Sequence, residues 1–111
     1  MTISETDTID FVQVNASDRR VNLIVADHLP WEGIGDADDQ HMYLLQEKLN
    51  SYLAYVETRQ LYSDYPDVVG YDIKLQVYGK FDRSPKGVEF YARLRSFLEQ
   101  SGYSIEFILK S

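Results

Sequence analysis

The sequence predicts a two-layer α+β domain with the element order β-β-α-β-α-β, in which a four-stranded mixed sheet has two helices packed on one face. Three observations support this fold class. Four runs have the composition or the alternation of strands, and two segments repeat apolar residues at helical spacing. The length of 111 residues suits one core. We expect one domain over residues 1–111, with a disordered tail at residues 1–8.

The first two strands are expected to form a β-hairpin. Residues 9–14 and 21–26 are β-rich runs, and the polar segment 15–20 between them is rich in turn-forming residues. Apolar residues occupy both faces of the second run, so this strand should be the more central of the two.

The first helix is predicted from about Asp38 to Leu61. On a helix of 3.6 residues per turn its apolar residues form one stripe about 100° wide, which consists of Met42, Leu45, Leu49, Tyr52, Leu53 and Val56. Asp36 or Asp38 could cap its N-terminus. Leu44 and Tyr55 lie off this stripe, so a second layer, the connection at 62–70 or a partner subunit should cover them.

The second half of the chain predicts a connection, a strand, a helix and a last strand. Residues 61–70 should form an ordered connection anchored by Tyr62 and Tyr65, and residues 71–78 alternate as a strand with one wet face. Ser84 followed by Pro85 is typical of a helix start, and Gly102 of a helix end. The apolar face of this helix is wide enough for two packing partners, and residues 103–110 alternate as the last strand.

The composition excludes several classes of function. The chain has no cysteine and therefore no disulfide or thiolate chemistry. A net charge of −7 argues against a nucleic-acid partner, which needs clustered lysine and arginine. Neither a secretion signal nor a run of about 20 apolar residues is present, so we expect a cytoplasmic protein without a membrane partner.

The negative charge is concentrated in the first part of the chain. Ten of the eighteen carboxylates lie in residues 1–47, where the only basic residues are Arg19 and Arg20. A field of one sign attracts surfaces of the opposite sign. A protein partner, if there is one, should therefore be basic.

The segment from Asp27 to Asp39 is the first candidate site, because it follows a strand and precedes a helix, where binding groups are often found. We expect this loop and neighbouring aromatic residues to form a partner-binding surface. Its predicted members are Asp27, His28, Trp31, Glu32, Asp36, Asp38, Asp39, Tyr43 and Tyr55.

The same region allows a second hypothesis, a small metal- or ligand-binding enzyme. Asp27, His28, Glu32 and His41 could together ligate a divalent metal, or a histidine and a carboxylate could exchange a proton. No HExxH pair, nucleophile elbow or glycine-rich phosphate loop is present. We therefore assign no catalytic residue, no metal ligand and no cofactor.

The function that we expect is a non-enzymatic protein-interaction module, in which charge sets the rate of encounter and aromatic residues hold the complex. A third hypothesis is a structural homodimer, formed through the aromatic faces of the helices.

The turn Asp27-His-Leu-x-Trp31 and the helix Leu44-Leu-Gln-Glu-Lys-Leu-Asn-x-Tyr52 resemble a family of small bacterial proteins that is known only as a domain of unknown function. The resemblance covers nearly the whole chain, although the stretch 33–39 is longer here than in the family pattern. It implies a shared α+β fold and supplies no catalytic residue. In character, but not in motif, the chain is also similar to acidic bacterial immunity proteins, which neutralise a basic toxin by charge complementarity.

Overall fold

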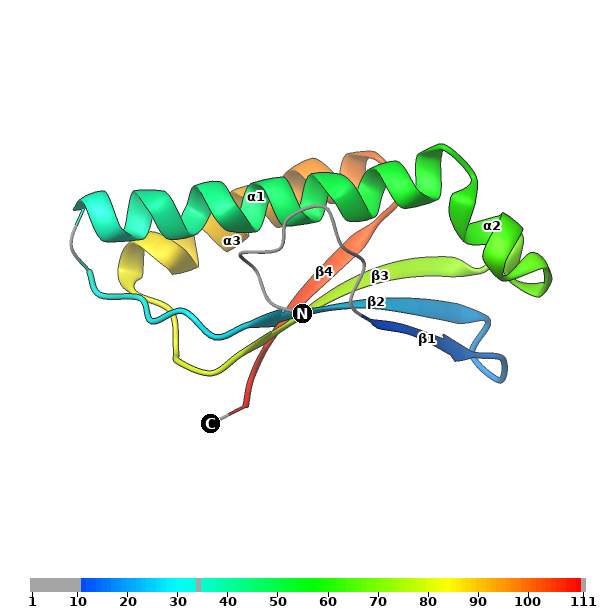
Figure 1. Ribbon diagram of the computed structural model, residues 1–111, viewed down its shortest axis with the longest axis horizontal. Helices are drawn as coiled ribbons and strands as arrows, with labels where there is room; N and C mark the ends of the chain where they lie inside the picture. The colour runs from blue at the N-terminus through cyan, green and yellow to red at the C-terminus, as the bar shows by residue number, and fades with distance from the viewer. Residues whose placement is uncertain (1–10, 34, 111) are drawn as a thin grey trace.

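The computed structural model describes residues 11–33 and 35–110 (Figure 1). The predicted tail at 1–8 and the first two residues of the predicted hairpin lie outside the described residues. The elements in chain order are β1 (Phe11–Asn15), β2 (Arg20–Asp27), α1 (Gly35–Glu57), α2 (Gln60–Asp64), a 3-10 turn η1 (Pro66–Val68), β3 (Asp72–Gly79), α3 (Pro85–Gln100) and β4 (Ser104–Leu109). The predicted order of the main elements is confirmed.

The four strands form one mixed sheet in the order β1-β2-β3-β4. β1 pairs antiparallel with β2, with Phe11 opposite Ile24, while β2–β3 and β3–β4 are parallel. The hairpin turns at residues 15–20, where Asn15 Oδ1 accepts a hydrogen bond from the Asp18 amide and Arg19 adopts a positive φ. β2, which we expected to be central, is indeed paired on both sides.

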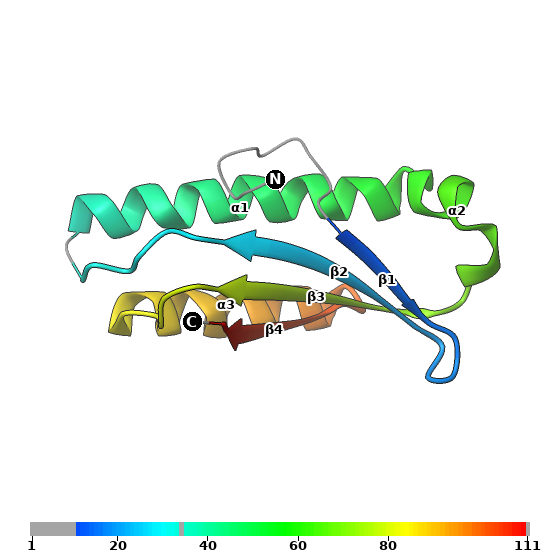
Figure 2. The same ribbon diagram turned by 60° about the horizontal axis from the view of Figure 1, so that its bottom comes forward.

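Both long helices lie on one face of the sheet (Figures 1 and 2). Alternate residues of β2, β3 and β4 point toward the helices, because successive side chains of a strand point to opposite faces. The core between the layers is formed by Val21, Leu23, Val25, Ile73, Leu75, Val77 and Ile105 of the sheet with Leu45, Leu49, Tyr52, Val56, Tyr91 and Leu98 of the helices.

The helix α1 ends four residues earlier than predicted. It runs from Gly35 to Glu57, and the chain then breaks at Arg59, whose φ of 67° is left-handed and incompatible with a continuous helix. Leu61, the predicted last residue, instead belongs to the short helix α2 and is buried. Apolar spacing alone could not show this break, because Leu61 continues toward the core after the turn.

The connection between α1 and β3 packs against the core through Leu61 and Val68, both buried. Tyr62 packs partly against the core, as expected, but Tyr65 is exposed, so the prediction that it is an anchor was wrong. The off-stripe Tyr55 donates a hydrogen bond from its hydroxyl to Asp64 Oδ2, at 2.7 Å. Of the three covers proposed for Tyr55, the connection is therefore the one found.

The helix α3 begins as predicted. Ser84 is its N-cap and accepts a hydrogen bond from the Gly87 amide at 3.1 Å, with Pro85 at the first helical position. The two packing partners of α3 are the sheet and α1. Phe97 nevertheless remains 62% exposed.

Candidate interaction surface

The candidate segment lies at the end of the sheet where the strands β2 and β3 terminate. Because these strands are parallel, the loop 28–33 after β2 and the loop 80–84 after β3 leave the sheet side by side, and each leads to the start of a helix. The Lys80 amide donates to the carbonyl of Asp27 at 3.0 Å, which joins the two loops at their origin.

Asp27 and His41 form a buried pair at this end of the sheet. His41 Nε2 lies 2.6 Å from Asp27 Oδ2, and neither side chain is more than 2% exposed. Asp27 Oδ1 accepts a hydrogen bond from the Leu29 amide at 3.1 Å. The pair thus links the last residue of β2 to the second turn of α1.

Trp31 covers this pair. Its ring stacks on the His41 ring, with the centroids 3.9 Å apart, and it is 9% exposed. On its other side it meets Gly87 of α3, where a Cβ atom would come within 3.1 Å of the indole ring. Trp31 therefore packs between its own loop and the helices α1 and α3, and it is not a surface residue.

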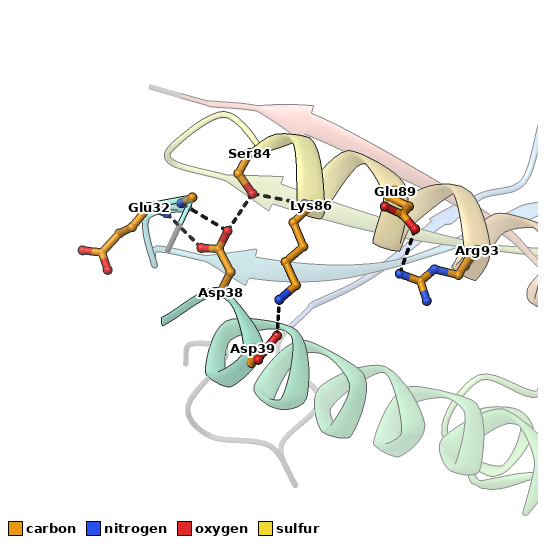
Figure 3. Close-up of polar contacts among 9 residues, drawn as sticks. Glu32, Asp38, Asp39, Ser84, Lys86, Glu89 and Arg93 are labelled. Atoms are coloured by element: carbon orange, nitrogen blue, oxygen red, sulfur yellow. Dashed lines mark hydrogen bonds and ion pairs between the residues drawn. The ribbon is translucent and has the colours of Figure 1, made fainter. Parts of the chain in front are cut away.

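Asp38 is also interior and holds the loop to both helix starts (Figure 3). Its carboxylate accepts hydrogen bonds from the Glu32 amide at 3.0 Å, the Gly33 amide at 3.2 Å and Ser84 Oγ at 2.8 Å. Burial alone would raise the pKa of Asp38, but the bond from Ser84 and the two amides outweigh it and hold the pKa below its usual value.

The next acidic residue, Asp39, is exposed and forms an ion pair with Lys86 of α3 (Figure 3). This pair bridges the N-terminal part of α1 to the first turn of α3 on the outside of the molecule, next to the interior contact of Asp38 with Ser84. Exposed pairs of this kind contribute about 0–1 kcal/mol.

The solvent-facing charge of α1 is uniformly negative. Its only basic residue, Lys48, is fully buried, whereas Tyr43 is 58% exposed. On a helical wheel of 100° per residue the side chains that share the side away from the core are those of Asp36, Asp39, Tyr43 and Glu47. We call these four residues the acidic face of α1; Glu47 is half-buried and the others are exposed.

A shallow apolar groove of about 310 Å³ runs between α1 and α3, beside the acidic face. Phe97 and Leu94 of α3 and Leu53 of α1 contribute its apolar surface. The full lining is Gln46, Leu49, Asn50, Leu53, Phe90, Arg93, Leu94, Phe97 and Leu98, which contains one charged residue. The Arg93 guanidinium is 3.4 Å from Glu89 on its own helix (Figure 3).

The nine predicted surface residues differ in their burial. Asp27, Trp31 and Asp38 are buried and make internal contacts, so the expectation that they are exposed was wrong. Their polarity and their place after a strand gave the same sequence signal as a binding loop. His28, Glu32, Asp36, Asp39 and Tyr43 are exposed at this end of the molecule, and the half-buried Tyr55 lies farther along α1.

The four residues of the enzyme hypothesis do not converge. Asp27 and His41 meet in the interior, while His28 and Glu32 face solvent. Within residues 11–33 and 35–110, no group of three or more histidine, aspartate or glutamate side chains could hold a metal ion. The contact between Asp27 and His41 links the strand β2 to the helix α1.

Residues that the sequence reasoning missed lie mostly on α3. Ser84 was recognised as a cap, but its bond to Asp38, 46 positions away, leaves no local signal. The groove was missed because it needs the relative placement of two helices, although the excess apolar width of α3 was a partial sign of it.

No helix in the described part of the chain is long and apolar enough to cross a membrane. Comparisons with curated proteins and with solved structures gave no match. A family model, in contrast, matches the chain over its whole length. The chain belongs to the family of unknown function DUF6572, which matches residues 1–111.

Proposed function

We propose that the protein is a non-enzymatic interaction module that binds a basic protein through the acidic face of α1 and the adjoining groove. The observation that supports this most directly is the charge of α1, whose basic residue Lys48 is buried while the carboxylates of Asp36 and Asp39 face solvent. A charge pattern of this kind favours association with a surface of opposite sign.

The groove supplies what charge alone lacks. Interfaces are held mainly by a few aromatic or apolar anchors that are surrounded by a polar rim. Tyr43 and Phe97 are large, rigid and more than half exposed; Phe97 lines the groove from α3, and Tyr43 belongs to the acidic face of α1. A partner would place apolar side chains in the groove and basic ones along the acidic face.

As in the comparison with acidic immunity proteins, the proposed partner is basic. The proposed binding surface is smaller than the one predicted from the sequence. The buried residues Asp27, Trp31 and Asp38 have no contact role in it, and instead they set the position of α1. The binding role passes to Asp36, Asp39, Tyr43 and Glu47. The partner is accordingly a protein with clustered lysine or arginine beside an exposed apolar residue.

The test begins with capture of interacting proteins from the native host at low and moderate salt, followed by binding measurements with each purified candidate. We expect affinity to fall on raising the salt concentration, to fall about threefold to tenfold in Asp36→Asn with Glu47→Gln, and to fall at least tenfold in Tyr43→Ala.

Asp72→Asn is the matched control, because Asp72 is an exposed carboxylate at the start of β3, at the opposite end of the sheet. It should leave affinity unchanged. A captured partner that binds all of these variants equally well, or the recovery of no partner at either salt concentration, would overturn the proposal.

A further inference from the structure

We propose that the protein forms a symmetric homodimer in which the β4 strands of two copies pair antiparallel, so that two four-stranded sheets become one sheet of eight strands. This surface is separate from the acidic face of α1 and from the groove. The proposal concerns the free edge of β4 and the side of α3 that borders it.

Among residues 11–33 and 35–110, β4 is an edge strand without the usual protection of an edge. It pairs regularly with β3 from Ser104 to Leu109, without a bulge. Its sequence, Ser-Ile-Glu-Phe-Ile-Leu, contains no proline and only one charge. Natural proteins block free edges with such devices or cover them, because unpaired backbone groups otherwise recruit another strand.

The backbone groups that are free to pair can be identified. The Lys110 amide donates to the Gly79 carbonyl of β3, and backbone groups of successive strand residues point alternately to the two sides. The amides and carbonyls of Ile105, Phe107 and Leu109 therefore point away from β3, toward the free edge.

An antiparallel register centred on Phe107 uses all of these groups. It places Phe107 opposite Phe107 of the second copy and Ile105 opposite Leu109, and each opposed pair exchanges two hydrogen bonds. Leu109, which is 47% exposed, gains an apolar neighbour. On the other face Glu106 meets Ile108, whereas a register shifted to centre on Glu106 would oppose two glutamates.

The helices fit the same arrangement. α3 covers the β4 side of the sheet (Figure 2). The rings of Tyr91 and Phe107 lie 5.4 Å apart there. Strands lie about 4.8 Å apart, so helices seated over β3 and β4 of each copy would lie about 10 Å apart, near the spacing of packed helices. Close packing at that distance requires small side chains at the contact.

On the side away from α1, α3 carries two compact side chains followed by two long charged ones. Its side chains Val88, Ala92, Arg95 and Glu99 share one face at helical spacing and are all exposed. Ala92 is next in sequence to Tyr91, whose ring contacts Phe107, so in the proposed dimer we place Ala92 beside the axis. The two charges of this row have opposite signs.

Charge also favours a second copy at this edge over other parts of the surface. Two chains of net charge −7 repel each other, most strongly where carboxylates are concentrated. Nine basic and eight acidic residues lie in residues 48–111, so the half that contains α3 and β4 is close to neutral. Two copies can meet there while both acidic faces remain exposed.

The test is the mass of the purified full-length chain by light scattering or sedimentation. The wild type should have twice the monomer mass of 12.9 kDa. Ala92→Arg and Leu109→Pro should both be monomeric, the first by bulk at the helix contact and the second by loss of an edge amide that β3 does not use. Circular dichroism checks that each variant is folded.

Two control variants separate this interface from others. Leu109→Ala keeps the amide, and Phe97→Arg alters the groove, so both should remain dimeric. Hydrogen exchange should be slow at the Phe107 and Leu109 amides of the wild type and fast in Ala92→Arg. A monomeric wild type, fast exchange at these amides in a dimer, or dissociation by Phe97→Arg would each overturn the proposal.

Discussion

His41 Nε2 lies 2.6 Å from Asp27 Oδ2 in the interior, and this contact joins β2 to α1. The other oxygen of this carboxylate, Oδ1, accepts a hydrogen bond from the Leu29 amide at 3.1 Å. A carboxylate taken out of water needs such partners, because its desolvation is costly. The pair therefore fixes the position of the N-terminal part of α1 relative to the end of β2.

Removal of the histidine should destabilise the fold strongly. His41→Ala leaves the Asp27 carboxylate buried without its closest partner and removes the ring on which Trp31 stacks. We expect a loss of about 3–5 kcal/mol in the free energy of unfolding, measured by urea denaturation at pH 7. His28→Ala is the control, because His28 is exposed and should change stability by less than about 0.5 kcal/mol. Equal stability of the two variants would contradict the role of the pair.

Asp38 and Ser84 should be energetically coupled. Ser84→Ala removes the cap of α3 and one bond to Asp38, and should cost about 1–2 kcal/mol. Asp38→Ala removes three hydrogen bonds, and should cost more. The loss of stability in the double variant should be smaller than the sum of the losses in the two single variants, because the shared hydrogen bond is lost only once. Simple additivity in urea denaturation would show that the bond contributes nothing.

Asp38 should also make stability depend on acid pH. The pKa of Asp38 in the folded protein lies below the reference value of 3.8, so its contribution is complete above that value and is lost as the pH falls through the lower folded pKa. The stability difference between wild type and Asp38→Asn should therefore be constant from pH 7 to about pH 4 and should shrink below it. A difference that stays constant down to pH 2 would contradict the lowered pKa.

The strands and long helices could be predicted from the sequence because their signals are local. The alternation of Ile73, Leu75 and Val77 and the Ser84-Pro85 start depend only on neighbours along the chain. The end of α1 could not be predicted, since the left-handed turn at Arg59 occurs in a residue type without a preference for it.

The candidate site was predicted less well for a related reason. Acidic residues at the end of a strand give the same sequence signal in two cases. They can face solvent in a binding loop, or they can be buried and stabilise the fold. Asp38 became interior because Ser84, which is remote in sequence, and two amides of the loop satisfy its carboxylate. Only the tertiary arrangement separates it from its exposed neighbours Asp36 and Asp39.

Gly79 should tolerate no side chain while Phe107 is present. A Cβ atom at Gly79 would overlap the ring of Phe107 on the adjacent strand. Gly79→Ala should therefore destabilise by about 1–3 kcal/mol, as expected for an overpacked core. In a Phe107→Leu background, where the ring is absent, the same change should cost clearly less, which a double-mutant cycle in urea would show. An equal cost in both backgrounds would point to backbone strain and not to the ring.

Tyr91 should limit stability at alkaline pH. Burial, and secondarily the charge of Asp27, raise the pKa of its hydroxyl above the usual value of 10.0. Its neutral form is thus favoured by folding, so this contribution is complete below pH 10 and is lost as the pH rises above it.

The buried hydroxyl has no hydrogen-bond partner among the described residues. Tyr91→Phe should therefore leave stability at pH 8 unchanged or raise it by up to about 1 kcal/mol, and should weaken the loss of stability between pH 10 and pH 12. Urea denaturation at both ends of this range measures the effect, and Tyr43→Phe, at an exposed tyrosine, is the control that should follow the wild type. A marked loss of stability at pH 8 in Tyr91→Phe would show that the hydroxyl is bonded in solution.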